Sequence, residues 1–290
     1  MRTDRAGGSP SRELSILGVL SAGTVGGMRI LVTGAAGNIG TVVSAGLAEQ
    51  GHLVRGLDLR EPADASTFAL GWITGSALDP ETVDRAVDGV EAVVHLAGNP
   101  GEASLPDSLE SHVHTTARLL DAMVRHGVPR MAYASSNHAV GMTERTDSLP
   151  VDVRGRPDTF YGVAKVAAEG LLSLYADRHG INSVAMRIGS FLPEPASTRA
   201  LATWLSPADT VRMVLAAVTT DRPGYHVLYG ISANSDGWWD LQPGHELGYS
   251  PQDDAAAFAG AVPDRPGDAA EGERVGGPFA LPDAGRPAFD

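Results

Sequence analysis

Between positions 29 and 188 short, mostly apolar runs alternate with longer stretches in which apolar residues recur three or four positions apart. The runs predict buried strands at 29–33, 53–58, 92–96, 130–135 and 183–188. The stretches between them predict amphipathic helices, such as 41–49 and 113–125, and Gly127 is placed to end the second of these. This alternation is typical of an α/β fold, in which helices cover both faces of a parallel sheet.

The pattern changes after Ser190, where Pro193 and Pro195 interrupt it. A helix is predicted at about 208–219 and a strand at 225–229. We expect a small C-terminal, substrate-covering region at about 190–262 that lies against the sheet. Residues 263–290 are rich in Pro, Gly, Asp and Glu, and by composition alone they predict a mobile tail.

The first 27 residues combine arginines, a short apolar run at 14–20 and small residues, which faintly resembles a secretion signal. However, Glu13 precedes this run and Gly18 interrupts it, and the first predicted strand begins directly after Met28. We therefore expect residues 1–27 to be a flexible N-terminal extension and Met28 to be the native start.

Composition narrows the possible functions. The 290 residues are 43% apolar, enough for one large α/β domain or two small ones. A formal charge of -13 argues against nucleic acid or an anionic membrane as a partner, and no apolar segment is long enough to span a bilayer. The chain has no cysteine, which excludes disulfides and thiol nucleophiles, and its nine histidines lack metal-ligand spacing, so we predict no metal site.

A glycine-rich turn follows the first predicted strand, in the sequence RILVTGAAGNIG at 29–40. Gly34 permits a tight turn, Gly37 lets the backbone approach a pyrophosphate, and Gly40 lets the helix pack closely on the strand. The helix N-terminus would then face the phosphate charge. The alternative is an ordinary turn, because the chain contains 35 glycines.

Asp58 ends the second predicted strand, where a carboxylate would meet the ribose hydroxyls of adenosine. A carboxylate there repels the additional phosphate of NADP and so favours NAD. Arg60 offers a cation that would weaken this discrimination. The alternative for Asp58 is a polar strand end.

Three further residues suggest chemistry. Ser136 follows an apolar run and should lie just beyond the carboxyl end of a strand, the edge at which ligands bind in open α/β sheets. Tyr161 and Lys165 are four residues apart and so share one face of a predicted helix. A phenol is a poor base at neutral pH, and a nearby ammonium stabilises its phenolate form.

Taken in order, the glycine turn, Ser136 and the YGVAK sequence at 161–165 resemble the extended short-chain dehydrogenase/reductases of the NAD-dependent epimerase/dehydratase family. The resemblance implies a Rossmann-type doubly wound parallel sheet over 28–262 and NAD as cofactor. It implies that Tyr161 is the general base, that Ser136 hydrogen-bonds the reacting oxygen, and that Lys165 binds the nicotinamide ribose and tunes Tyr161. The cofactor contacts that it implies are Gly34, Gly37, Asn38, Ile39, Gly40, Asp58, Leu59, Arg60, Ser76, Ala77, Leu96, Ala97, Gly98, Tyr161, Lys165 and Ile188.

A finer resemblance is to the uronate dehydrogenases, which oxidise the anomeric carbon of galacturonate or glucuronate to an aldarolactone. It is carried by SSNHAVG at 135–141, RIGSFLPEP at 187–195, RALATW at 199–204 and SANSDGWWD at 232–240. It implies that Ser136, Asn137, His138 and Ser190 contact the sugar and that Arg199 binds its carboxylate. The GGPF sequence at 276–279 is also similar, so part of the tail at 263–290 is expected to be ordered over the site.

Two positions depart from the uronate dehydrogenase pattern. Pro100 stands where that family has a substrate-binding serine, and Asn99 or Ser104 could substitute for the lost hydroxyl. Ser76, followed by Ala77, stands where the family has an adenine-facing aspartate. The cofactor prediction is therefore firmer than the prediction of the sugar.

Alternative interpretations remain open. The enzyme could be an aldose or sugar-phosphate 1-dehydrogenase or a nucleotide-sugar epimerase/dehydratase, and the protein could instead be a non-catalytic NAD sensor. His138 could bond a loop carbonyl, and Arg199 could pair with Glu194. Trp238 and Trp239 are interpreted as packing residues. We expect a cytoplasmic homo-oligomer that acts on a small sugar or sugar acid.

Overall fold

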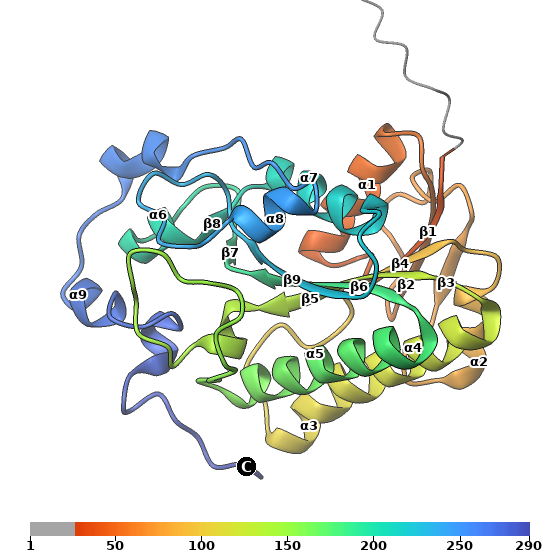
Figure 1. The fold of residues 1–290 in the computed structure, drawn as a ribbon, viewed down its shortest axis with the longest axis horizontal. Helices are drawn as coiled ribbons and strands as arrows, with labels where there is room; N and C mark the ends of the chain where they lie inside the picture. Colours follow the sequence, from red (N-terminus) through yellow and green to blue (C-terminus); the bar gives the residue numbers. More distant parts are fainter. Residues whose placement is uncertain (1–26) are drawn as a thin grey trace, which may run out of the picture.

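A seven-stranded parallel sheet forms the centre of the computed structural model, which describes residues 27–290 (Figure 1). Its strands are β1 (Arg29–Thr33), β2 (Leu53–Asp58), β3 (Trp72–Thr74), β4 (Ala92–His95), β5 (Arg130–Ser136), β6 (Asn182–Ile188) and β9 (Tyr225–Gly230). Their order is β3-β2-β1-β4-β5-β6-β9, so the chain changes direction across the sheet between β1 and β4. The predicted doubly wound sheet is confirmed. The predicted N-terminal extension, residues 1–27, lies outside the described part of the chain except for residue 27.

Helices cover both faces of this sheet (Figure 1). On one face lie α1 (Asn38–Glu49) and α7 (Pro207–Thr219), and on the other lie α2 (Pro80–Val87), α4 (Thr115–His126) and α5 (Phe160–His179). Successive residues of a strand point to opposite faces. Ile30 and Val32 of β1 accordingly pack in one core and Leu31 in the other, and all three are fully buried.

Two features of the sheet layer were not predicted from the sequence. Strand β3 is only three residues long and half-buried or exposed, so it leaves almost no apolar run. The predicted helix at 113–125 begins as a π-helical segment (Glu110–His114) and continues as α4, which Gly127 ends with a φ of 69°. The wider π turn changes which side chains face the sheet edge, a common feature of functional sites.

The region predicted as a separate cover, 190–262, is divided between two parts of the fold. Helix α7 and strand β9 belong to the doubly wound layers, because β9 pairs with β6 along its length. The remainder forms a smaller layer with the strands β7 (Ser190–Phe191) and β8 (Trp204–Leu205), helix α6 (Thr198–Thr203) and helix α8 (Gln242–Glu246). Trp238 and Trp239 stack with ring centroids 3.9 Å apart inside its own core, so they are packing residues.

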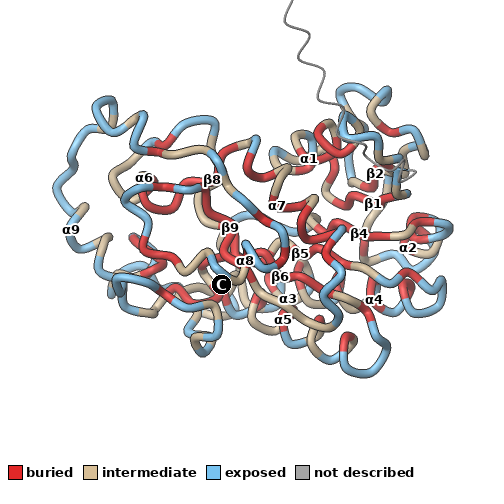
Figure 2. Tube along the Cα trace, turned by 45° about the horizontal axis from the view of Figure 1, so that its top comes forward, coloured by how far each residue is buried: buried red, intermediate tan, exposed pale blue. Residues whose placement is uncertain are grey.

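The tail packs against the loop that follows β5, contrary to the mobile segment that its composition predicted. Around α9 its residues are exposed or half-buried (Figure 2). Val275 is fully buried, and its amide donates to the carbonyl of Thr143 at 3.0 Å. The amide of Gly276 donates to the carbonyl of Gly141 at 2.8 Å. These contacts use backbone groups, which composition does not reveal. The tail also forms α9 (Asp268–Glu271) and a 3₁₀ turn at Gly277–Ala280.

Candidate active site

The turn between β1 and α1 accepts only glycine at two positions. Gly34 has a φ of 69°, and a Cβ there would lie 2.8 Å from the amide nitrogen of Ala97. A Cβ on Gly40 would lie 2.1 Å from the carbonyl oxygen of Gly34. The N-cap of α1 is Gly37, which has no side chain to bond the first amides of the helix. The turn therefore leaves backbone donors for a phosphate, as a dinucleotide requires.

Asp58 lies beside this turn at the end of β2. Its Oδ2 accepts a hydrogen bond from the amide of Ala36 at 3.0 Å, and its Oδ1 accepts one from the amide of Arg60 at 3.1 Å. The guanidinium of Arg60 is mostly exposed and donates to the carbonyl of Ala36 at 3.1 Å. The carboxylate is thus held at the rim of the glycine turn, where it fits an adenosine ribose.

The remaining predicted cofactor residues lie at the same carboxyl edge of the sheet. They follow β1, β2, β3 and β4 or end β6: Gly34, Gly37, Asn38, Ile39, Gly40, Leu59, Ser76, Ala77, Leu96, Ala97, Gly98 and Ile188. Leu59 is strongly exposed, whereas Ala77 and Ile188 are buried. The hydroxyl of Ser76 accepts a bond from the amide of Leu78 at 3.1 Å, so it is engaged locally.

The structure brings Ser136, Tyr161 and Lys165 together. Ser136 is the last residue of β5, and Tyr161 and Lys165 lie in the first turns of α5. The hydroxyl of Ser136 accepts a hydrogen bond from the amide of His138 at 3.2 Å. The Nζ of Lys165 donates to the carbonyl of Ala134 at 2.6 Å and lies 5.1 Å from the centre of the Tyr161 ring. This arrangement suits proton transfer to or from a hydroxyl at the sheet edge.

Burial controls the protonation of this group. It raises the pKa of Tyr161 to about 12, although the hydrogen bond from Ser136 opposes the shift. It lowers the pKa of Lys165 to about 7, against the attraction of Glu169. Desolvation is the largest influence on the pKa of both groups.

A carboxylate from a distant loop positions the start of α5. Oε1 of Glu102 accepts the amide of Phe160 at 2.9 Å, and Oε2 accepts the amide of Tyr161 at 3.1 Å. An acidic group at a helix N-terminus is favoured by the helix dipole and by the free amides. Glu102 was not identified from the sequence, because its partners are far along the chain and no local spacing relates them.

His112, in the π-helical segment, is a second residue that the sequence did not reveal. It is buried, and its ring packs edge-to-face on the Tyr161 ring with centroids 5.0 Å apart. Its Nε2 lies 3.0 Å from the carbonyl oxygen of Asn99, while its Nδ1 has no partner among the described residues. Burial lowers its pKa to about 2, so it is a neutral ring that donates from Nε2.

The predicted substrate residues lie between β5 and the cover. Arg199 donates through Nη2 to the carbonyl of Val275 at 2.8 Å and through Nη1 to Ser190 Oγ at 3.5 Å. Its Nε is buried without a partner among the described residues. Ser190 also bonds Thr203 at 2.8 Å. Arg199 is therefore not the surface partner of Glu194 that an alternative interpretation expected.

His138 and Asn137 follow Ser136 directly. The Nδ1 of His138 lies 2.9 Å from Oδ2 of Asp158, so the ring bonds a carboxylate and not a loop carbonyl. The side-chain Nδ2 of Asn137 is buried and has no partner within the described part of the chain. A buried donor without a partner is rare in proteins and is consistent with a ligand contact.

The two residues that could replace the missing hydroxyl beside Pro100 each accept a hydrogen bond within their own loop. Pro100 is exposed. The Oδ1 of Asn99 accepts the amide of Gly101 at 3.1 Å, and the hydroxyl of Ser104 caps α3 (Leu105–Leu109) by accepting the amide of Asp107 at 3.2 Å. Both candidates proposed to replace the missing serine are therefore engaged within their own loop.

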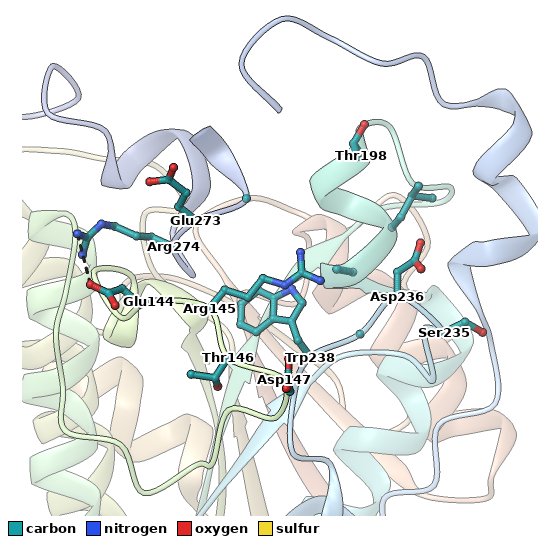
Figure 3. Close-up of a pocket in the computed structure, with 14 residues that line it drawn as sticks. Glu144, Arg145, Thr146, Asp147, Thr198, Ser235, Asp236, Trp238, Glu273 and Arg274 are labelled. Atoms are coloured by element: carbon teal, nitrogen blue, oxygen red, sulfur yellow. Dashed lines mark ion pairs between the residues drawn. The ribbon is translucent and has the colours of Figure 1, made fainter. Parts of the chain in front are cut away.

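A separate pocket of about 940 Å³ lies between the loop after β5, α6 and the tail (Figure 3). Arg145 lies across the Trp238 ring, with its guanidinium carbon 5.7 Å from the ring centre. None of the cofactor or substrate residues predicted from the sequence lines this pocket. This pocket is therefore separate from the predicted chemistry at Ser136 and Tyr161.

The dinucleotide-type turn beside a Ser–Tyr–Lys group defines a class: enzymes that transfer a hydride between a nicotinamide nucleotide and a carbon that bears a hydroxyl. No cluster of His, Asp and Glu suited to a metal ion occurs in residues 27–290, and none of the helices described there is long and apolar enough to cross a membrane.

Comparisons with known proteins agree with this class. Residues 30–215 match the model of the NAD dependent epimerase/dehydratase family, and the chain belongs to that family. The chain is 36% identical over 238 residues to a uronate dehydrogenase of Pseudomonas syringae pv. tomato, covering 82% of this chain and 86% of that protein. It is 35% identical over 255 residues to an NAD-dependent glucose-6-phosphate dehydrogenase of Haloferax volcanii, covering 79% and 95%.

Among solved structures, a uronate dehydrogenase from Agrobacterium tumefaciens superimposes with a TM-score of 0.82 at 36% identity, covering 90% of this chain and 98% of that one. The predicted family, the Rossmann-type fold and the cofactor NAD are thereby confirmed. The individual site residues remain predictions that rest on the geometry above.

Proposed function

We propose that this protein oxidises the anomeric carbon of a cyclic uronic acid to an aldarolactone, with NAD as the hydride acceptor. The choice of substrate rests on the hydrogen bonds that the Arg199 guanidinium makes and on the one that it does not make. Its guanidinium lies beside Ser190, donates to one backbone carbonyl and keeps a buried Nε without a partner among the described residues. A planar donor with unused hydrogen-bonding capacity suits a carboxylate. Similarity to uronate dehydrogenases over most of the chain supports the same choice.

In the proposed reaction Tyr161 receives the proton of the anomeric hydroxyl, and Ser136 hydrogen-bonds the same oxygen. Ser136 ends β5 and Tyr161 lies in the first turn of α5, so both hydroxyls would reach that oxygen from the carboxyl edge of the sheet. The chemistry that bound NAD supplies is acceptance of the hydride from the anomeric carbon. Lys165, buried beside the Tyr161 ring, provides the positive charge that favours phenolate formation.

The cofactor would lie along the carboxyl edge of the sheet. The turn at Gly34–Gly40 would hold the pyrophosphate, Asp58 the adenosine ribose and Lys165 the nicotinamide ribose. The Cβ clashes at Gly34 and Gly40 and the uncapped start of α1 support this placement.

Asn137, His138 and Ser190 would contact the sugar hydroxyls, and Pro100 would border the pocket without a hydrogen bond. A sugar-phosphate dehydrogenase is the second candidate, because one relative of similar identity acts on glucose 6-phosphate by its name and a guanidinium also binds phosphate. We further propose a cytoplasmic homo-oligomer. Size-exclusion chromatography of the purified protein would test the oligomer.

The test is NADH formation with galacturonate, glucuronate, galactose, glucose, arabinose and glucose 6-phosphate. We expect turnover confined to the two uronates. Arg199→Ala should lower kcat/KM for them by about 10- to 100-fold, the loss of one or two charge-assisted hydrogen bonds. Arg222→Ala is the matched control, since that guanidinium pairs with Glu246 on the surface. Turnover confined to glucose 6-phosphate, or equal losses on charged and neutral sugars, contradicts the proposal.

A further inference from the structure

The histidine of the substrate site is held by a fully buried carboxylate. Nδ1 of His138 lies 2.9 Å and 3.0 Å from the two oxygens of Asp158, whose side chain is 0% exposed. The only other side-chain contact of this carboxylate among the described residues is with Thr159 Oγ1 at 3.4 Å. A buried carboxylate is costly unless it accepts good hydrogen bonds. Its main donor here is therefore the imidazole ring.

Two glycines pack closely against the Asp158 carboxylate, where no larger residue would fit. A Cβ on Gly141 would lie 2.1 Å from the Asp158 Cγ, and a Cβ on Gly276 would lie 1.7 Å from its Oδ2. The amide of Gly276 bonds the carbonyl of Gly141 at 2.8 Å, so the tail closes over the carboxylate. Asp158 and its donor are thus locked in one geometry by the packing of two distant segments.

The rest of the ring faces the substrate side of the site. The His138 ring packs edge-to-face on Phe279, with centroids 5.0 Å apart, and lies 6.0 Å from the Tyr161 ring. Its side chain remains 19% exposed, and its Nε2 makes no hydrogen bond to any described residue. The edge that carries Nε2 is thus the part of the ring that remains free for a substrate.

We infer that Asp158 is a positioning residue that holds His138 as the Nδ1–H tautomer, so that Nε2 presents a lone pair to the substrate. A ring nitrogen in this state accepts a hydrogen bond from a sugar hydroxyl and does not bind a carboxylate. Arg199 and His138 therefore divide the recognition: Arg199 supplies donors for the acid group, and His138 supplies an acceptor for a hydroxyl. The inference rests on the proposed function for the identity of the sugar.

Replacement of Asp158 by Asn keeps the size of the side chain but allows its amide to donate to Nδ1. The proton would then move to Nε2, and the acceptor would be lost, in the way that the wrong tautomer disables a histidine held by an aspartate in a catalytic triad. We expect Asp158→Asn to lower kcat/KM by about 10- to 100-fold, as for other partners that orient a functional histidine. The loss should fall mainly on KM, because His138 binds and does not transfer the proton.

A double-mutant cycle distinguishes positioning from support of the fold. If Asp158 acts through His138, Asp158→Asn combined with His138→Ala should be no slower than His138→Ala alone, to within about threefold. Asp209→Asn is the matched control, because Asp209 is also fully buried but accepts the amides of Gln252 and Asp253 away from the site. The reduction in kcat/KM that Asp209→Asn causes should multiply with the reduction that His138→Ala causes. Additive losses for Asp158→Asn as well would overturn the inference.

The tautomer of the His138 ring can be determined by NMR in the absence of substrate. Long-range ¹H–¹⁵N NMR spectra at pH 7.5, with the His138 signal assigned by its disappearance in His138→Ala, should show a proton on Nδ1 and none on Nε2. An Nε2–H tautomer or a doubly protonated ring would overturn the inference, even if Asp158→Asn fails to fold. If the sugar panel excludes uronates, the proposed function fails, while this spectrum and the cycle on the active sugar still test the role of Asp158.

Discussion

Lys165 is the only lysine in the 290-residue sequence, so its amine can be followed without interference from another lysine. It is buried, its Nζ donates to the carbonyl of Ala134 at 2.6 Å, and it lies 4.9 Å from the Tyr133 ring centre. Burial lowers its pKa from 10.5 to about 7. In protein labelled with ¹³C-lysine we expect one side-chain amine signal that titrates near pH 7.

This pKa predicts that Lys165 destabilises the fold at neutral pH. The folded value lies about 3.5 below the ordinary one, which at 1.36 kcal/mol for each pKa unit corresponds to about 5 kcal/mol at most. Between pH 7 and 10.5 the unfolded chain holds more protons on this lysine than the folded chain does, so stability rises with pH across that window. The penalty is about 4 kcal/mol at pH 7 and about 2 kcal/mol at pH 9.

Replacement by Met removes the penalty and keeps a long side chain, but it leaves the Ala134 carbonyl without this donor, at a cost of about 1–2 kcal/mol. We therefore expect Lys165→Met to raise the free energy of unfolding by about 3 kcal/mol at pH 7 and by less than about 1 kcal/mol at pH 9. Turnover should be lost, because the charge beside Tyr161 is gone. Such a variant would be more stable and less active, a common trade-off at active sites.

The assay is urea denaturation of both proteins at pH 7 and pH 9. The control is Arg178→Met at the exposed end of the same helix, for which the difference from wild type should not depend on pH. The reasoning is refuted if the lysine signal titrates above pH 9. It is also refuted if Lys165→Met is less stable than wild type by the same amount at both pH values.

Three further predictions concern the catalytic base, the cofactor and the core. Tyr161→Phe should lower kcat by about 10²- to 10⁴-fold, while NAD affinity measured by fluorescence stays within a few-fold; unchanged turnover would remove Tyr161 from its role. Asp58→Asn should reduce the preference for NAD over NADP by about tenfold, or ~1.4 kcal/mol, measured as a ratio of kcat/KM values, and an unchanged ratio would contradict its ribose contact. Arg187→Met should cost about 3–5 kcal/mol in urea denaturation, because Glu169, bonded to Arg187 at 2.8 Å, is left buried without its guanidinium partner and keeps the hydrogen bond from Ser135; adding Glu169→Gln should restore most of the loss.

Several elements of the fold could be predicted from local sequence patterns. A central strand of a parallel sheet is buried on both faces, so β1, β4 and β6 appear as mostly apolar runs and were predicted to within a residue. The glycine turn and the pairing of Tyr161 with Lys165 are also local, since they depend on spacings of a few residues within one turn or helix.

Other elements were decided by contacts between distant segments. Strand β9 is half-buried at its start and resembles part of a cover, yet it completes the sheet because β6 offers its free edge. The tail is polar in composition, yet its backbone amides bond the loop after β5. Composition describes only the side chains, so it does not predict backbone hydrogen bonds between segments.

By itself, then, the sequence determined the α/β class, most strands of the nucleotide half and the cofactor class, and it predicted the reacting side chains, because these follow from periodicity and from motifs within one element. Only the tertiary structure decided that His138 meets Asp158 and that Glu102 caps the helix of Tyr161. It also decided the pKa of Lys165, because that value depends on how much water the surrounding segments exclude. Burial and long-range pairing are properties of the packed chain, and no spacing along the sequence encodes them.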